Sequence, residues 1–489
     1  MWMLALATLS LVSQNPPANS AQPVLQTGAI NPRVTCAAKP EQSYALYLPS
    51  HYAPDKRWPI VYAFDPDGRG SVPVELMKEA AERYGYIVAG SNNSRNGSWK
   101  VEGDAAQAMW DDTHARLAID ERRVYFAGFS GGARVASILA QRCKCAAGVL
   151  LNGAGFGGAA PSPDAVFAVF AAVGRFDFNY PELSELDGKL EQAGFPHVLR
   201  HFDGPHEWAP SDVMDDALAW FRLMAMKQGR EARDDDFITA QKTEAVARAH
   251  ALEQSGESYG AWREYKQAVA TFQGLTDTAS LQQATASLAQ QKSVREGGKR
   301  EEQDFEEQRR LTGEIYSGLI ALKGGGKSPS STSQTDQPIA PRSAVPASHG
   351  EAQSRSDVFH QTEQQIVNLR ERAASEKNPE KLRVDRRALS GVFIAAGEFG
   401  DESLEAKDYA RAKGYFQLAV DAYPDSVGAL KELATARALD GDRKGTLETL
   451  RRAKERSKDA AAFVAWLNEE PAFAKLREDP QFRALMGSP

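Results

Sequence analysis

The residues most able to do chemistry lie in Gly128-Phe-Ser-Gly-Gly132, a G-x-S-x-G pattern. The apolar run 124–129 before it predicts a strand, and the pattern 133–141 after it predicts a helix. Glycines at both ends of the motif allow the tight turn that lifts a serine above the edge of a sheet. The N–H of Gly131 would then lie at the amino end of the helix, where it can stabilise a negatively charged oxygen. The pattern predicts Ser130 as a nucleophile, against the simpler interpretation of an inert serine in a glycine-rich turn.

A serine nucleophile needs a base, and the base needs an acid that orients it. The chain supplies both, in order, after Ser130. Asp177 follows the predicted strand 166–173, and His206 follows the predicted strand 197–202. The spacings of 47 and 29 residues leave room for the intervening helix and strand in each case. We therefore expect Asp177 and His206 to meet Ser130 at one edge of the sheet.

Other residues compete for these two roles. Glu182 and Asp203 are alternative acids, although Asp203 lies only three residues before His206 and fits a turn-shaping role better. Among the histidines, His197 and His201 fall in or beside a predicted strand, where a structural role is expected. His206 follows the strand in a loop, and loops are where catalytic residues collect.

The elements that must position these residues follow an alternating plan. Short apolar runs alternate with helical patterns from about residue 59 to residue 202, and residues 212–227 predict a closing helix. Continuous apolar runs predict strands covered on both faces, as in a parallel sheet. The segment 43–48 alternates and predicts an antiparallel edge strand. The expected fold class for residues 36–229 is therefore α/β, with a doubly wound, mostly parallel sheet.

On these motifs residues 40–228 resemble an α/β-hydrolase of the esterase and dienelactone-hydrolase-like group, which includes feruloyl-esterase and polyhydroxybutyrate-depolymerase relatives. Gly128–Gly132 matches the nucleophile elbow, Gly174–Asp177 matches the acid turn, and Gly204-Pro-His-Glu-Trp208 resembles the histidine loop. The resemblance implies a serine hydrolase that forms an acyl-enzyme, acts on a small-molecule or acyl-ester substrate and uses no cofactor. A serine peptidase on the same fold is the alternative within this class.

One loop departs from the family pattern. Many relatives place a His-Gly pair after the strand that ends here at Phe64, and the following N–H completes the oxyanion hole. This chain has Asp65-Pro-Asp-Gly-Arg-Gly70 instead. Pro66 has no N–H to give, and carboxylates near an oxyanion would be unfavourable unless they are turned away. We predict the Asp67 N–H as the second donor. The departure also favours an alternative function, a binding protein whose hydrolase half is a degenerate scaffold.

A polar loop, residues 91–99, is predicted to rim the same edge of the sheet. Asn92, Asn93, Arg95 and Trp99 are its candidate substrate-binding residues. The competing interpretation is a turn-rich loop that only contacts solvent.

The second half of the chain changes to long amphipathic helical patterns. Ala412, Phe416 and Ala419 recur 34 residues later as Thr446, Leu450 and Ala453. A 34-residue period with small residues at helix crossings resembles a degenerate tetratricopeptide repeat (TPR) array. That resemblance implies a protein partner for this half.

The predicted organisation has five parts: a signal peptide 1–20, the hydrolase domain 36–229, a helical region 230–322, a flexible linker 324–355 and a TPR-like region 356–489. The run Trp2–Val12 with small residues at 18 and 20 predicts export to the periplasm or outside the cell. In an oxidising compartment Cys36 could pair with Cys143 or Cys145, or the cysteines could stay free. A fragment of about 21–229 is expected to fold alone and to hydrolyse small esters at near full-length rates.

Composition excludes several other classes. Apolar residues make up 42% and charged residues 25% of the chain, as in ordinary globular proteins. The net charge of −7 and the lack of a basic stripe argue against nucleic-acid binding. No run approaches the roughly 18 apolar residues that a membrane span needs. No metal-ligand spacing is present, so no metal site is predicted.

Overall fold

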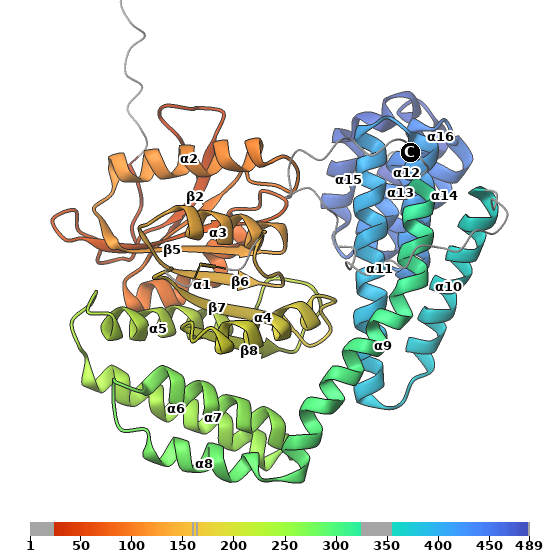
Figure 1. The fold of residues 1–489 in the computed structure, drawn as a ribbon. Coiled ribbons are helices and arrows are strands. Elements are labelled where there is room, and N and C mark those ends of the chain that lie inside the picture. The colour runs from red at the N-terminus through yellow and green to blue at the C-terminus, as the bar shows by residue number, and fades with distance from the viewer. Residues whose placement is uncertain (1–23, 159–160, 163–164, 324–354, 488–489) are drawn as a thin grey trace, which may run out of the picture.

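The computed structural model describes residues 24–158, 161–162, 165–323 and 355–487. A sheet flanked by helices is followed by two groups of helices (Figure 1). The predicted signal peptide 1–20 lies outside the described residues, as does all but the last residue of the predicted linker 324–355.

One eight-stranded sheet forms the first part, in the order β1-β2-β4-β3-β5-β6-β7-β8. The two pairs that involve β2 are antiparallel, and all the others are parallel. The expected mostly parallel α/β sheet is therefore confirmed, and the first strand is an element that the apolar runs did not predict. The strands are β1 (Ile30–Thr35), β2 (Ser43–Tyr47), β3 (Trp58–Phe64), β4 (Ile87–Ser91), β5 (Ile119–Phe129), β6 (Ala146–Asn152), β7 (Ala168–Gly174) and β8 (His197–Phe202).

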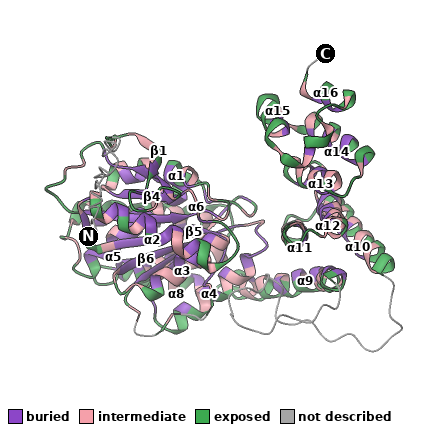
Figure 2. Ribbon diagram, turned by 90° about the horizontal axis from the view of Figure 1, so that it is seen from above, coloured by how far each residue is buried: buried purple, intermediate pink, exposed green. Residues whose placement is uncertain are grey.

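Both faces of the sheet are covered, which explains the continuous apolar strands. Every residue of β3, β6 and β7 is buried, and Figure 2 shows the buried interior with exposed outer helix faces. Helices α1 and α5 pack on one face, while α2, α3 and α4 pack on the other. Their bounds are α1 (Ser71–Tyr84), α2 (Trp99–Arg116), α3 (Gly131–Arg142), α4 (Tyr180–Gln192) and α5 (Ser211–Lys227).

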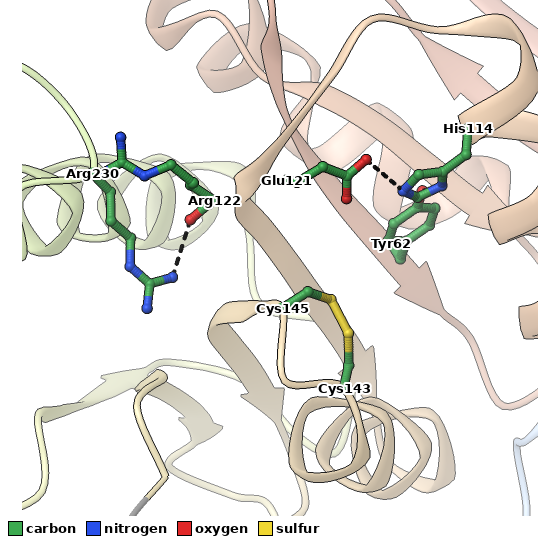
Figure 3. Close-up of a disulfide and its surroundings, with 7 residues drawn as sticks. All are labelled: Tyr62, His114, Glu121, Arg122, Cys143, Cys145 and Arg230. Atoms are coloured by element: carbon green, nitrogen blue, oxygen red, sulfur yellow. Dashed lines mark hydrogen bonds and ion pairs between the residues drawn. A yellow bond between two sulfur atoms is a disulfide. The ribbon is translucent and has the colours of Figure 1, made fainter.

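The apolar core of this part does not end at residue 229. A single buried cluster runs from the sheet through α5 into α6 (Asp235–Gln254), α7 (Ser258–Phe272) and α8 (Ala279–Ala289). Trp220 of α5 donates from its indole to Thr271 Oγ1 at 3.1 Å. Arg230, just beyond the expected boundary, donates to the Arg122 carbonyl of β5 at 3.0 Å (Figure 3). The packing unit that contains the sheet therefore includes helices that follow the boundary drawn from composition.

Helix α9 (Lys292–Lys323) connects this unit to a second helical group (Figure 1). Its carboxyl half joins a separate buried cluster with the later helices. Helices α12 and α14 begin 34 residues apart, and Asp408 and Asp442 cap them by accepting backbone N–H bonds. A large all-helical region is thus confirmed, and its repeat type stays a prediction. Its other elements are α10 (Arg355–Ser375), α11 (Pro379–Glu405), α12 (Tyr409–Ala422), α13 (Val427–Leu439), α14 (Arg443–Arg456), α15 (Ala460–Glu469), the 3₁₀ helix η1 (Pro471–Leu476) and α16 (Pro480–Met486).

The cysteines pair differently from the disulfides considered above. Cys143 and Cys145 are bridged just after α3 (Figure 3), with Cα atoms 5.1 Å apart, a normal separation for a disulfide. Cys36 is buried and free. Burial raises the pKa of its thiol to about 11, so it stays protonated and unreactive at neutral pH.

Candidate active site

Ser130 occupies a strained turn between β5 and α3. Its backbone has φ 53° and ψ −122°, and among the described residues only one other non-glycine residue has positive φ. Such strain persists only where the surroundings enforce it. Here the enforcement is close backbone packing: a Cβ on Gly128 would lie 2.0 Å from the Gly132 carbonyl oxygen, and one on Gly132 would lie 2.0 Å from the Phe64 oxygen. Both glycines are therefore needed to raise the serine above the sheet.

The structure brings Ser130, His206 and Asp177 together in one hydrogen-bonded chain. His206 Nε2 lies 2.8 Å from Ser130 Oγ, and His206 Nδ1 lies 2.9 Å from each carboxylate oxygen of Asp177. The Asp177 side chain is fully buried and that of His206 is 6% exposed. If Nδ1–H donates to Asp177, Nε2 is free to accept the serine proton. The arrangement can therefore activate a serine hydroxyl.

The competing acids have other partners. Glu182 forms a bidentate ion pair with Arg134, with N–O distances of 2.8 and 2.9 Å, and accepts a hydrogen bond from the Gly155 N–H. Asp203 is exposed and lies 3.3 Å from Arg175. Neither carboxylate is recorded in contact with His206, which leaves Asp177 as the residue that orients the imidazole.

The two histidines nearest His206 in the sequence have structural surroundings. His197 lies 3.3 Å from an oxygen of Asp187. The His201 ring packs on Tyr180 at 4.9 Å, and burial pulls the pKa of His201 well below its ordinary value. His197 therefore serves in ion pairing and His201 in packing, and neither is recorded in contact with Ser130.

Two phenylalanines enclose the His206 ring. Phe129 of β5 lies 4.7 Å from it and Phe178 lies 4.5 Å from it, measured between ring centroids. Apolar walls of this kind limit the rotation of the imidazole and exclude water from its faces. Phe178 directly follows Asp177, so the acid turn also supplies part of this wall.

The structure explains the unusual acidic sequence of the loop after β3, because its first carboxylate has buried partners. The Asp65 side chain is fully buried and accepts bonds from the Arg69 guanidinium at 2.9 and 3.0 Å and from the Trp208 indole at 2.8 Å. Burial alone would raise the pKa of Asp65, but the Arg69 and Trp208 bonds outweigh it and lower that pKa. Asp65 is thus an ionised anchor that ties this loop to the loop carrying His206.

The same carboxylate removes Asp67 from its predicted role. The Asp67 N–H donates to Asp65 Oδ1 at 2.9 Å, so it is already occupied and not free for an oxyanion. The Asp67 side chain is exposed and pairs with Arg69 at 3.1 Å. The prediction of Asp67 as the second oxyanion donor is therefore not supported by this geometry.

Asn96 is a neighbour of the serine turn that the sequence did not single out. Its side-chain oxygen would lie 1.8 Å from a Cβ built on Gly131, so the amide rests directly against the residue after the serine. The Asn96 N–H donates to the Pro66 carbonyl at 2.8 Å, which ties it to the loop after β3. The only available signal was its membership of the polar loop, because its approach to Gly131 depends on how two distant loops meet.

Three of the four predicted substrate-binding residues have side chains that contact other parts of the protein, and the fourth, Arg95, does not. The Asn92 amide donates to the Pro32 carbonyl at 3.2 Å, and Asn93 bonds the Ser43 N–H and the Glu41 carbonyl, so both asparagines fix the antiparallel edge of the sheet. Trp99 begins α2 and packs its ring under the Arg142 guanidinium at 4.7 Å. Arg95 is exposed and its backbone pairs with Asp67. Of these four residues, only Arg95 has a side chain with no recorded partner, so it is the one whose side chain remains available for a substrate.

Two features that would point to other chemistry are absent from the described residues. No group of three or more His, Cys, Asp or Glu side chains in them is placed to hold a metal ion. No helix in the same part of the chain is long and apolar enough to cross a bilayer.

Comparisons with known proteins find matches among solved structures only; no protein-family model and no curated protein matches. One match is the fluorophosphonate-binding serine hydrolase F of Staphylococcus aureus, 13% identical, TM-score 0.31, covering 37% of this chain and 92% of its own. A ferulic acid esterase is 18% identical, TM-score 0.32, with the same coverages. The feruloyl esterase module of Clostridium thermocellum is 18% identical, TM-score 0.31, covering 42% and 92%.

The class of the first part is set by its own topology. An eight-stranded, mostly parallel sheet with helices on both faces and a serine at the β5–α3 turn is the arrangement of the α/β-hydrolase fold. The helical region lies outside that fold.

Proposed function

We propose that the protein is a serine hydrolase that cleaves carboxylic esters through an acyl-enzyme. The observation that carries the proposal is the bridging position of His206, within 2.9 Å of both Asp177 and Ser130. A buried carboxylate, an enclosed imidazole and a strained serine serve no evident packing purpose together, and they are the groups that activate a hydroxyl.

The reaction follows from these positions. Ser130 Oγ attacks the ester carbonyl carbon while His206 Nε2 takes its proton, and Asp177 stabilises the imidazolium. Collapse of the tetrahedral intermediate breaks the bond to the alcohol oxygen, which receives the proton from His206. A water, deprotonated by His206, then attacks the acyl-enzyme, releases the carboxylic acid and returns the proton to Ser130.

The oxyanion would be stabilised by Gly131 and Asn96. The first N–H groups of a helix have no intrahelical partner, so the Gly131 N–H can donate outward. A half-turn of the Asn96 amide exchanges its oxygen and nitrogen and brings a donor to the same place. Loss of one side-chain donor of this kind costs about 10²–10³ in kcat. We expect that loss in Asn96→Ala, with little change in KM, whereas a wild-type kcat would remove Asn96 from the proposal.

A fluorophosphonate probe tests the function directly, because labelling requires an activated serine. The wild-type protein should label and Ser130→Ala should not. Ser98→Ala is the matched control, since Ser98 is exposed at the start of α2 and makes no side-chain capping bond. A wild-type protein that fails to label would favour the alternative of a binding protein with a degenerate hydrolase part. Faster turnover of amides than of esters would favour the peptidase alternative.

Two further proposals concern the rest of the chain. We propose that residues 1–20 direct export, supported by their apolar run and by a disulfide that suits an oxidising compartment. Sequencing of the mature amino terminus should then begin at Ala21, and an intact Met1 in cell extracts would contradict this.

We also propose TPR-like protein binding by α11–α14, supported by the 34-residue helical period. A surface exchange of α13 residues should then abolish capture of the partner without changing esterase activity.

A further inference from the structure

The turn that carries Asp177 is contacted by helices that come far later in the chain. Arg387 of α11 is buried and donates from Nε to the Arg175 carbonyl at 2.8 Å. Its guanidinium lies 3.7 Å from the centroid of the Tyr180 ring. Arg175 and Tyr180 are close neighbours of Asp177 on either side, so one arginine spans the whole turn.

Helix α9 contacts the same turn from a second direction. Gln308 is buried, and its amide donates to the Phe178 carbonyl at 2.8 Å. Gly391 of α11 lies against the side chain: a Cβ there would be 3.1 Å from Phe178 Cβ. The backbone and the side chain of Phe178 are thus both fixed by residues beyond the sheet.

These contacts lead directly to the reacting groups. Phe178 packs beside the His206 ring, with the two ring centroids 4.5 Å apart, and Asp177 lies at hydrogen-bond distance from Nδ1 of the same ring. Both carbonyls that the helices bind lie within two residues of Asp177. A shift of the turn would therefore move the carboxylate and the aromatic wall at the same time.

The buried charge of Arg387 indicates that this residue is there to make a specific hydrogen bond and not only to fill space. Within the described residues no carboxylate is recorded at ion-pair distance from it; Asp304 and Glu301 attract this buried cation only at longer range, and its recorded direct contacts are a carbonyl and a ring. Burying a guanidinium costs more than burying an apolar side chain of the same volume. Its specific contribution is the bond that fixes the Arg175 carbonyl.

We infer that Arg387 and Gln308 are positioning residues of the active site, and that α9 and α11 complete the catalytic unit by fixing the Asp177 turn against His206. The inference rests on the proposed esterase function. Neither residue touches the substrate or the reacting atoms; each acts through the turn.

The test measures kcat and KM of the full-length protein on p-nitrophenyl acetate. Arg387→Met and Gln308→Leu each remove a donor and keep the side-chain volume. Misplacement of a catalytic group by about 1 Å can cost 10²-fold, so we expect kcat to fall about 10- to 100-fold, with KM within about threefold. Arg387→Lys retains a cationic donor and should recover part of the loss.

Arg372→Met is the matched control. Arg372 pairs with Glu307 of α9 and Asp385 of α11 at 3.0 Å each, but no contact with the acid turn is recorded for it. It should keep kcat within about twofold although it loosens the same two helices. A second measurement is the downfield proton NMR signal of the His206 Nδ1–H bound to Asp177, which should weaken in Arg387→Met and Gln308→Leu and persist in Arg372→Met.

The outcomes separate this inference from the function on which it rests. If the wild-type protein labels with the fluorophosphonate probe but both turn variants keep wild-type kcat and an unchanged NMR signal, the inference is overturned. It is also overturned if Arg372→Met loses as much activity as they do. Failure of the wild-type protein to label would instead overturn the proposed function.

Discussion

The serine turn and the acid turn lie on the same edge of the sheet but are fixed by very different lengths of chain. The turn at Ser130 is enforced by Gly128, Gly132 and the Phe64 carbonyl, all within or beside the motif's own strands. The turn at Asp177 also needs Gln308 and Arg387, from two helices of the carboxyl-terminal half. Half of the site is therefore a local motif, and half depends on tertiary packing across the chain.

The largest effect expected after removal of the serine itself comes from the acid. Asp177→Asn keeps the shape of the turn but favours the wrong imidazole tautomer, so kcat on p-nitrophenyl acetate should fall about 10⁴-fold. Glu182→Gln should leave kcat nearly unchanged, because Glu182 pairs with Arg134 and not with His206. A reversed result would make Glu182 the acid.

A truncated chain should show whether the acid turn, unlike the serine turn, depends on the later helices. The structure changes the sequence-based expectation for the fragment 21–229, because that fragment exposes the α5 surface buried by α6–α8 and leaves the acid turn without Gln308 and Arg387. We now expect it to be insoluble, or soluble with kcat/KM at least about a hundredfold lower on p-nitrophenyl acetate. A soluble fragment with full-length kcat/KM would show that the acid turn is as self-sufficient as the serine turn.

The anchor between the β3 loop and the histidine loop should have an intermediate effect. Asp65→Asn removes a buried charge that bonds Arg69 and Trp208, and we expect a loss of about 1–3 kcal/mol in the free energy of unfolding. The measurement is denaturant unfolding, with kcat followed in parallel. Asp67→Asn is the control, because that carboxylate is 65% exposed and its removal should change stability by less than about 0.5 kcal/mol.

The smallest expected effect is a difference in pH dependence between the two halves. Bonds from Ser50 and Tyr47 outweigh the effect of burial and lower the pKa of Glu82 to about 2. Glu82 therefore stabilises the fold above pH 4.5, and this stabilisation is lost as the pH falls toward 2. Desolvation, reinforced by Asp401 and Asp67, raises the pKa of Glu432 to about 7.

Glu432 has the opposite sign, because the folded state holds its proton longer than the unfolded chain does. Its favourable contribution is complete below about pH 4.5 and is lost as the pH rises through 7. Glu432 nevertheless keeps contact with solvent, which weakens the desolvation, so the effect should be small. Glu432→Gln should flatten the fall in Tm between pH 5 and pH 8, and Glu82→Gln should flatten the fall below pH 4.5. Unchanged Tm profiles in both variants would contradict these assignments.

The sequence was sufficient wherever a short pattern dictates a backbone. The glycines around Ser130, the order of serine, acid and histidine, and the continuous apolar strands predicted the sheet and the three residues that meet at its edge. Asn96 and the occupied Asp67 N–H were not predictable, because both depend on how the loop after β3 folds around Asp65. Arg387 and Gln308 gave no signal, since a buried arginine or glutamine on an amphipathic helix looks like any other polar residue until its partner is known.

The charge change near residue 230 did not reveal that the buried core continues into α6–α8, for a related reason. Helices α6–α8 carry many charged residues, yet their Ile238, Ala249 and Leu288 side chains complete the core under α5. Composition reports the solvent-facing majority of a helix, whereas packing depends on the few residues that face inward.

The distance along the chain between Ser130 and Arg387 also sets the time at which the site can be completed during synthesis. At about 5–20 residues per second, the ribosome needs on the order of tens of seconds to make the segment between them. Once residue 177 has been made, the nascent chain contains both the serine motif and the acid turn, but the acid turn still lacks Gln308 and Arg387. Labelling of stalled nascent chains with the fluorophosphonate probe should therefore rise only after α11 has left the ribosome. A catalytic support made this far after the nucleophile delays hydrolysis until that later part of the chain has been synthesised.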